Sequence, residues 1–413
     1  MKQNKEVPLP RLPLVPGLFG NFGKFVMKKK ELGIYIHIPF CKSKCDYCDF
    51  ISYPNKTDKV EAYFEAVKKE IQRYNLEKYN VTTIYIGGGT PSYVDSKYIC
   101  DILKELKIKL RNNQTELKDM EITIEVNPGT VVEEKLRMYK NIGINRISIG
   151  LQSTNDNLLK QIGRIHNYKE FINTYELAKK VGFQNINVDL MIGLPNQTIQ
   201  ELKKSLEDIK ILNPNHVSIY SLIVEEGTKI EKQLTSGEIE LPDEEVERQM
   251  YWYVKNTLEL NGYNHYEISN FAKKGNESRH NLNCWNQKEY IGLGIAAHSY
   301  IDGIRYSNTI DLEKYLEANF NNNQELETKR IRIMEEVQSL EDKKKEYMLL
   351  GLRKIEGVSI SKFKSRYIDN PIFLYRKELE KLVEEKLISI EGDYIKLTNR
   401  GLDLANLVWE EFV

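Results

Sequence analysis

The sequence predicts an α/β protein in three parts: an incomplete parallel (β/α)6 barrel, an irregular α+β region and a C-terminal winged-helix-like domain. Strand-like runs and amphipathic helical stretches alternate from about residue 33 to residue 225, a pattern typical of βαβ units on a parallel sheet. Six such units suggest an incomplete barrel. Unusual polar residues and glycines fall at the ends of the predicted strands, where barrels of this type collect their active residues.

Each predicted strand is a short run rich in Ile, Val and Tyr that ends in Gly, Pro or a polar residue. The six strands are Ile34–Ile38, Thr83–Gly87, Ile122–Val126, Arg146–Leu151, Asn185–Ile192 and His216–Leu222. The stretches between them carry apolar residues at helical spacing; Val60, Phe64, Val67 and Ile71 share one face of the first. The predicted helices are Lys59–Tyr74, Ser96–Leu110, Val132–Asn141, Tyr168–Val181 and Thr198–Leu212.

The rest of the chain divides into two further segments. Residues 226–335 show one clear helix, Glu244–Glu259, and otherwise little regular pattern. Residues 336–413 have the order of a winged helix, with three helices, a hairpin and a closing helix: Lys343–Arg353, Ser359–Arg366, Phe373–Glu385, Leu387–Thr398 and a helix from about Arg400. The third helix mixes basic with acidic residues, whereas a DNA-recognition helix carries a basic excess. We therefore expect a packing or docking role for residues 336–413.

Composition limits the possible partners and the compartment. Lysine plus arginine equal aspartate plus glutamate, 60 each, which argues against a nucleic-acid partner. No apolar run approaches the roughly 20 residues that span a bilayer. Five cysteines, three of them clustered, fit a reducing compartment better than a disulfide scaffold. We expect a cytoplasmic protein without a transmembrane segment, and leave open a peripheral location at a membrane.

The first 30 residues differ from the rest and form a fourth segment, ahead of a barrel at residues 31–225. This segment carries several prolines and no periodic apolar face. It also lacks the 7–15-residue apolar core of a secretory signal. Met27 precedes the first strand in the manner of a natural start. Our hypothesis is that residues 1–26 are a disordered extension or an upstream start-site artefact.

Three cysteines directly after the first strand indicate a metal cluster. Cys41, Cys45 and Cys48 lie within eight residues. Thiolates hold iron–sulfur clusters, normally four for a [4Fe–4S] cube, so three would leave one iron open to an outside ligand. The alternative from spacing alone is a zinc site completed by His37, since Cys3His sites exist.

A glycine-rich run follows the second predicted strand. The segment Gly87-Gly88-Gly89-Thr90-Pro91 would let another group approach the backbone closely. A phosphate-binding loop is a rival interpretation, but the Gly-Lys-Ser/Thr ending of such loops is absent. A plain turn is the third interpretation of this run.

Four polar residues at or near the ends of later strands predict a ligand site. Glu125 and Asp189 lie within apolar strands, where an acid is costly unless it is paired. Gln152 ends the fourth strand, and Arg164 precedes His166 in what we expect to be a short helical segment. One such residue alone is more often structural, but four around one barrel mouth favour ligand binding.

The cysteine loop, the Gly-Gly-Gly-Thr-Pro run and Gly193-Leu194-Pro195 after Asp189 resemble the radical S-adenosylmethionine (SAM) superfamily. They resemble in particular the branch that holds oxygen-independent coproporphyrinogen III oxidases and HemW-type haem chaperones. The resemblance implies a [4Fe–4S] cluster on the three cysteines. It also implies SAM contacts by residues matching the family's positions: Tyr35, Tyr47, Gly88, Gly89, Thr90, Glu125, Gln152, Arg164 and Asp189. Glu125 and Asp189 can accept hydrogen bonds from amino or ribose hydroxyl groups, and Arg164 can pair with a carboxylate.

Two features divide the branch. Oxidases of this type resemble Cys-x3-Cys-x2-Cys-x-Cys, and here Phe50 takes the fourth position. HemW-type proteins carry His-Asn-x-x-Tyr-Trp, and here the segment runs from His280 to Trp285 with Cys284 in place of tyrosine. Histidine, tyrosine and thiolate all ligate haem iron, so the resemblance implies His280 and Cys284 as candidate ligands and leaves the ligand set open. His298 is a second candidate, while His37 and Cys100 have expected structural roles.

The sequence thus predicts a cluster-bearing, SAM-binding carrier that holds haem as cargo and delivers it to acceptor proteins, including ones at a membrane. The enzyme alternative is a coproporphyrinogen III oxidase that cleaves SAM to a 5′-deoxyadenosyl radical and decarboxylates a porphyrinogen. A third interpretation is a degenerate barrel with a structural cluster. The sequence leaves open whether SAM is cleaved or only bound, and therefore whether the protein is an enzyme.

Overall fold

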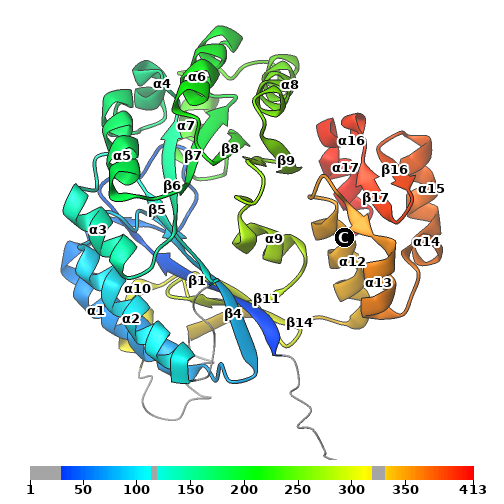
Figure 1. The fold of residues 1–413 in the computed structure, drawn as a ribbon. Helices are drawn as coiled ribbons and strands as arrows, with labels where there is room; N and C mark the ends of the chain where they lie inside the picture. The colour runs from blue at the N-terminus through cyan, green and yellow to red at the C-terminus, as the bar shows by residue number, and fades with distance from the viewer. Residues whose placement is uncertain (1–28, 113–118, 319–330) are drawn as a thin grey trace, which may run out of the picture.

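The computed structural model describes residues 29–112, 119–318 and 331–413; the expected extension, residues 1–26, lies outside them. Six parallel strands form the centre of one curved sheet (Figure 1). In spatial order they are β1 (Lys30–Ile38), β4 (Tyr79–Gly88), β5 (Glu121–Val126), β6 (Arg146–Gln152), β7 (Asn185–Ile192) and β8 (His216–Ser221). Each overlaps a predicted strand, which confirms the α/β class.

Helices cover the outer face of these strands, as Figure 1 shows. They are α1 (Val60–Arg73), α2 (Ser96–Asn112), α3 (Glu133–Asn141), α4 (Asp156–Gln161), α5 (Tyr168–Val181) and α6 (Ile199–Leu212). Local signals set their ends: capping boxes at Asn167 and Thr198 start α5 and α6, and Gly182, in the left-handed region at φ 94°, ends α5. One local prediction is wrong. Arg164 lies in the loop after α4 and not in a helical segment, because Gly163, at φ 72°, follows the end of the helix.

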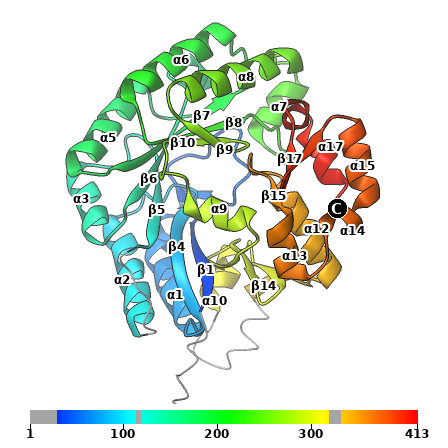
Figure 2. The same cartoon turned by 45° about the vertical axis from the view of Figure 1, so that its right-hand side comes forward.

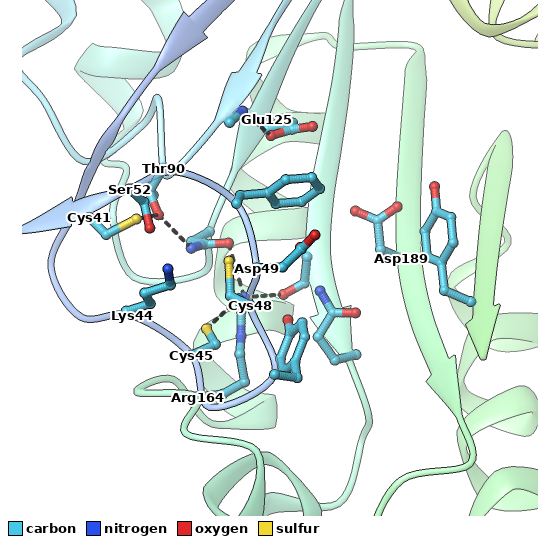
Figure 3. Close-up of a pocket in the computed structure, with 18 of the residues that line it drawn as sticks. Cys41, Lys44, Cys45, Cys48, Asp49, Ser52, Thr90, Glu125, Arg164 and Asp189 are labelled. Carbon is cyan, nitrogen blue, oxygen red and sulfur yellow. Dashed lines mark hydrogen bonds between the residues drawn. The ribbon is translucent and has the colours of Figure 1, made fainter. Parts of the chain in front are cut away.

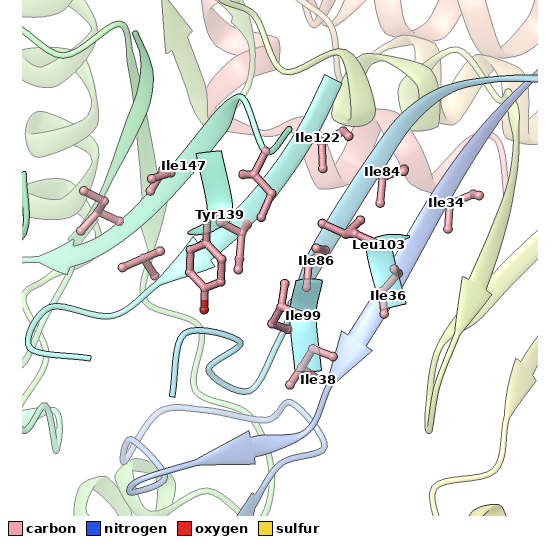
Figure 4. Close-up of a cluster of buried hydrophobic side chains, with 14 of the residues drawn as sticks. Ile34, Ile36, Ile38, Ile84, Ile86, Ile99, Leu103, Ile122, Tyr139 and Ile147 are labelled. Atoms are coloured by element: carbon pink, nitrogen blue, oxygen red, sulfur yellow. The ribbon is translucent and has the colours of Figure 1, made fainter. Parts of the chain in front are cut away.

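The two faces of the parallel strands differ in character because successive side chains point to opposite sides. Ile34 and Ile36 of β1 and Ile84 and Ile86 of β4 point outward and pack, fully buried, with residues such as Leu103 of α2 (Figure 4). The alternate residues of the same strands are polar or aromatic and face inward. The apolar layer therefore holds the strands in place, and the inner face carries the chemistry.

The region 226–335 is more regular than the sequence suggests. Besides α8 (Glu244–Leu260) it contributes α7 (Lys229–Thr235), β9 (Asn264–Glu267), β10 (Asn270–Ala272), α9 (Arg279–Trp285), β11 (Glu289–Leu293), β12 (His298–Ile301), β13 (Ile304–Asn308), α10 (Leu312–Glu317) and β14 (Arg332–Val337). β11 pairs with β1 in parallel, while the β12–β14 strands on one edge and β10–β9 on the other are antiparallel. The six strands of the predicted barrel are parallel as expected, but they are the centre of a larger sheet: the described sheet is mixed and has 12 strands.

Residues from 340 onward have a hydrophobic core of their own. Their elements are α12 (Leu340–Gly351), β15 (Val358–Ser359), α13 (Ile360–Tyr367), α14 (Pro371–Leu374), α15 (Arg376–Glu384), β16 (Ile388–Glu391), β17 (Tyr394–Leu397), α16 (Asn399–Asp403) and α17 (Ala405–Glu410). The predicted hairpin is present as β16 and β17, and β15 pairs with β17. Figure 2 shows this domain beside the barrel, with α9 between the two. In the described parts of the chain, no helix is long and apolar enough to cross a membrane.

Candidate functional site

The cysteine loop is anchored at both of its ends to β1. The short strands β2 (Phe40–Cys41) and β3 (Tyr53–Pro54) pair and close it. The Nε2 of His37 lies 2.8 Å from the carbonyl oxygen of Ile51 and must donate to it, while Nδ1 accepts from the hydroxyl of Tyr35 at 3.0 Å. Burial lowers the pKa of His37, which keeps the ring neutral. Both ring nitrogens therefore have hydrogen-bond partners within the fold, which argues against His37 as a zinc ligand.

The three thiols line one cavity of about 490 Å³ at the C-terminal ends of the strands (Figure 3). Most of the residues assigned by resemblance to SAM line the same cavity: Tyr47, Gly88, Gly89, Thr90, Glu125, Gln152, Arg164 and Asp189. Tyr35, His280 and Cys284 line a neighbouring cavity instead. Within the described residues, no three Cys, His, Asp or Glu side chains are placed to hold a single metal ion.

A short polar network connects the thiols to the strand ends. Nη1 of Arg164 donates to Sγ of Cys45 at 3.5 Å, and Oγ1 of Thr90 donates to Sγ of Cys41 at 3.5 Å. Asn127 joins the two donors, since it donates to Thr90 Oγ1 at 2.9 Å and accepts from Arg164 Nη2 at 3.0 Å. Gly89 needs to be glycine, because an added Cβ would lie 2.9 Å from the Cys41 sulfur. The network gives two of the thiols a polar partner.

Asn127 is a site residue that the sequence analysis missed. It follows Glu125 by two residues, and that spacing is the one signal that could have found it, since side chains two apart on a strand share a face. It lines the cavity beside Glu125.

Burial opposes ionisation of two of the loop cysteines in the free protein. It raises the pKa of the Cys48 thiol to about 11 and raises the pKa of the Cys41 thiol. A coordinated thiol is nevertheless deprotonated by its metal. The positive charge of the Arg164 guanidinium, which lies beside the loop, acts in the other direction on the pKa of Cys41 and favours its thiolate. These three thiols therefore fit a cluster in which each sulfur binds a different iron atom. The thiols would release their protons when the cluster binds.

Two half-buried carboxyl groups are held on the strands at the far side of the cavity (Figure 3). Glu125 accepts from the backbone N–H of Gly88 at 3.1 Å and from the hydroxyl of Tyr85 at 2.9 Å, and burial raises its pKa to about 7. Asp189 accepts from Ser148 Oγ at 3.1 Å and from Asn187 Nδ2 at 2.7 Å, and burial raises its pKa as well. Both carboxyls keep free acceptor capacity toward the cavity, which suits a cationic or hydroxyl-bearing ligand.

The backbone brings Gln152 to the same cavity. Its φ of 70° is unusual for a residue other than glycine, and the β6–β7 pairing shifts register between Gly150 and Gln152. Such a bulge redirects a side chain near an active site. This unfavourable backbone conformation lies at the strand end that also carries the cavity-lining residues.

The neighbouring cavity, of about 500 Å³, lies between α9 and the inner face of the sheet. The residues lining it include Tyr35, His37, Ile51, His280, Cys284, Tyr290, Ala296, His298, Ile310 and Ile333, and it shares Asp49 and Phe50 with the first cavity. Much of this lining is aromatic or aliphatic. The end of the cysteine loop therefore forms a wall common to both cavities.

The helix α9 is held firmly against the barrel. The backbone N–H groups of Arg279 and His280 donate to the two carboxylate oxygens of Glu121, each at 3.0 Å. Nδ1 of His280 lies 2.9 Å from Thr83 Oγ1, and its ring centre lies 5.2 Å from that of Tyr85. Burial lowers the pKa of His280 to about 4 and raises that of Cys284 to about 11. At neutral pH both side chains are uncharged.

The C-terminal domain contacts the other end of α9. The guanidinium of Arg353 lies 4.5 Å from the ring centre of Trp285 and 4.6 Å from that of Trp409. The hydroxyl of Tyr367 donates to the side chain of Gln287 at 2.7 Å. The helix thus lies between the barrel and the C-terminal domain, as Figure 2 shows.

Comparison with known proteins identifies the family. The radical SAM superfamily model matches residues 35–209, and the HemN C-terminal domain model matches residues 338–404. Similar proteins described as "Heme chaperone HemW" come from Lactococcus lactis (38% identity, 94% of this chain, 98% of that protein) and Bacillus subtilis (37%, 92% and 98%). Another, from Escherichia coli, has 32% identity over 94% of this chain and all of its own length.

A solved structure shares the fold. The Escherichia coli coproporphyrinogen III oxidase HemN superposes with a TM-score of 0.76 at 22% identity, over 93% of this chain and 90% of its own. At that identity the likeness shows the fold alone. The relatives that match over nearly their whole length, together with the family models, show that the chain belongs to the radical SAM superfamily and, within it, to the HemW family.

Proposed function

We propose that this protein is a haem chaperone that binds haem in the cavity beside α9 and delivers it to acceptor proteins. The relatives named for this role match it over nearly their whole length. The observation that carries the proposal is the second cavity itself. Its size suits a large planar ligand, its lining is largely aromatic and aliphatic, and it contains His280 and Cys284, whose side-chain types ligate haem iron.

The first cavity is the proposed seat of the resident cofactors. Cys41, Cys45 and Cys48 would hold a [4Fe–4S] cluster by three of its irons, and Glu125 and Asp189 line the same cavity. When bound, the reduced cluster and SAM supply radical chemistry, because the cofactor carries the difficult step. The chain's own residues would orient SAM: Gly88, Gly89 and Thr90 by backbone groups, and the two carboxyls by accepting hydrogen bonds.

Phe50 supports a role in haem carriage rather than in the decarboxylation of coproporphyrinogen III. It stands where a fourth loop cysteine is found in the oxidases that the sequence resembles, and its side chain is 61% exposed at the wall common to both cavities. An exposed aromatic ring at this position can contact a porphyrin face. It cannot act as a fourth thiol.

We propose a winged-helix-like arrangement for the C-terminal domain and a role in packing, since it contacts α9 through Arg353 and the turn after α9 through Tyr367. The helix α15 pairs Arg376 with Glu380, so its charge is balanced and gives no basic surface for DNA. We propose residues 31–225, 226–335 and 336–413 as the functional divisions of the chain. A cytoplasmic protein meeting its acceptors, including those at a membrane, fits this set of features.

One experiment tests the function. Anaerobically reconstituted protein is titrated with haem, and a second sample is incubated with coproporphyrinogen III, SAM and a reductant. We expect a saturable bound-haem absorption spectrum and no release of carbon dioxide. Formation of protoporphyrinogen without haem binding would overturn the proposal in favour of the oxidase.

A further inference from the structure

His298 differs from the other histidines of the chain. The sequence has six, and five of them are buried and form ring hydrogen bonds within the fold: His37, His166, His216, His265 and His280. His298 is exposed, and among the described residues its ring has no hydrogen-bond partner. Its imidazole is therefore available to a ligand in a way that the others are not.

The sheet directs this imidazole into the second cavity. His298 starts β12 and lies opposite Ser307 of β13, while Tyr300 of the same strand lies opposite Tyr290 of β11. Residues two apart on a strand, and partners across a sheet, share a face. That face carries Tyr290, His298, Ser307 and Ile333, and all four line the cavity.

The helix α9 contributes another wall of the same cavity. His280 and Cys284 are four residues apart, hence on one side of the helix, and both line the cavity. Three neighbours fix the His280 ring. Its Nδ1 lies 2.9 Å from Thr83 Oγ1, and its centre lies 5.2 Å from that of the Tyr85 ring. Its Cε1 lies so close to Gly33 that a Cβ on that residue would be 3.4 Å away. Three side chains of iron-ligating types thus line this cavity, one from the sheet and two from the helix.

We propose that His298 is an axial ligand of the haem iron, supplied by the sheet wall of the cavity. The assignment rests on the proposed function, because it presupposes that haem occupies this cavity. A neutral imidazole nitrogen donates its lone pair to iron, and a planar porphyrin between the two walls offers one axial position to each. His298 would then occupy one axial position of the iron, and a side chain of α9 would occupy the other.

The test exploits the exposure of His298. Haem is titrated into the reconstituted wild-type protein and the His298→Gly variant, with absorption and electron paramagnetic resonance spectra recorded. We expect about a tenfold or greater loss of affinity, as for residues that support a metal ligand, together with a changed spin state. Added imidazole should enter the vacated space and restore the six-coordinate spectrum.

Ser307→Ala is the matched control. Ser307 is paired with His298 across the two strands and lines the same cavity. Serine is not among the residues that commonly ligate haem iron, which are His, Cys, Met and Tyr. Ser307→Ala removes no iron ligand, so the spin state of the haem that it binds should equal that of the wild type, with or without imidazole. His298→Met should keep a bound haem with a shifted spectrum, because methionine also ligates haem iron.

The outcomes separate the two proposals. A wild-type protein that binds no haem would overturn the proposed function and this assignment with it. Haem binding by the wild type with an identical spectrum in His298→Gly would overturn the assignment alone. A spectral change that imidazole does not reverse would also overturn it, since the loss would then come from the altered cavity wall.

Discussion

Arg164 donates from Nη1 to the sulfur of Cys45 at 3.5 Å, although the two residues are 119 positions apart. The loop after α4 thereby places a buried cation against the cysteine loop. Nη2 of the same guanidinium donates to the carbonyl oxygen of Gly150 at 2.7 Å, so the strand end β6 fixes the position of the cation. The cysteine loop and the strand-end residues are one assembled site.

Cluster binding should depend on each loop cysteine. Cys45→Ala is expected to abolish the [4Fe–4S] cluster, because two thiolates would remain for a cube that needs about three or four. Iron and sulfide content after anaerobic reconstitution measures this. Cys100→Ala is the control, since Cys100 lies on α2 with its sulfur 3.8 Å from the Met138 carbonyl oxygen and lines neither cavity. Full iron content in Cys45→Ala would contradict the assignment.

SAM affinity should depend on Asp189. Asp189→Ala is expected to weaken SAM binding by about ten- to hundredfold, the range for losing hydrogen bonds to a charged group, with unchanged cluster absorbance. Equilibrium binding of SAM to the reconstituted protein measures it. The control Glu176→Ala removes an exposed carboxylate from α5, away from the cavity. Equal dissociation constants for wild type and Asp189→Ala would show that this carboxyl has another purpose.

Glu125 should make folding stability depend on pH. Burial raises the pKa of its carboxyl from 4.5 to about 7, so between these values the folded protein keeps a proton that the unfolded chain releases. The resulting stability is fully present below about pH 4.5 and is lost as the pH rises through 7.

The size of this loss is at most roughly 3 kcal/mol, from the pKa difference. Urea unfolding of apo wild type and Glu125→Gln at pH 5 and pH 8 isolates it, because the remaining titrating groups are common to both proteins. The variant should gain stability relative to wild type at pH 8. A pH-independent difference between the two proteins would disprove the raised pKa.

Arg353 should couple α9 to the C-terminal domain. Its guanidinium lies between Trp285 and Trp409, and two such contacts contribute about 1–2 kcal/mol when partly desolvated. Arg353→Ala should lower the free energy of unfolding by that amount and broaden the bound-haem spectrum. Arg376→Ala, which removes an exposed arginine paired with Glu380 on α15, should change neither. An unaltered haem spectrum in Arg353→Ala would mean that α9 is positioned by the barrel alone.

The sequence by itself determined what depends on local pattern. The six parallel strands and their helices follow from alternating and helical periodicity, and the ends of α5 and α6 follow from Asn167, Gly182 and Thr198. The cysteine spacing and the residues that end strands were also readable, because the ends of parallel strands necessarily meet at one edge.

Only the tertiary structure decided the pairings between distant short strands. β11 lies beside β1 although 250 or more residues separate their paired positions, such as Leu32 and Glu289, and no local periodicity encodes that register. This pairing builds the sheet wall that carries His298 and turns Tyr35 toward the second cavity. The sequence could not show that the residues lining the second cavity form one group. Their proximity arises from long-range hydrogen bonding and packing rather than from spacing along the chain.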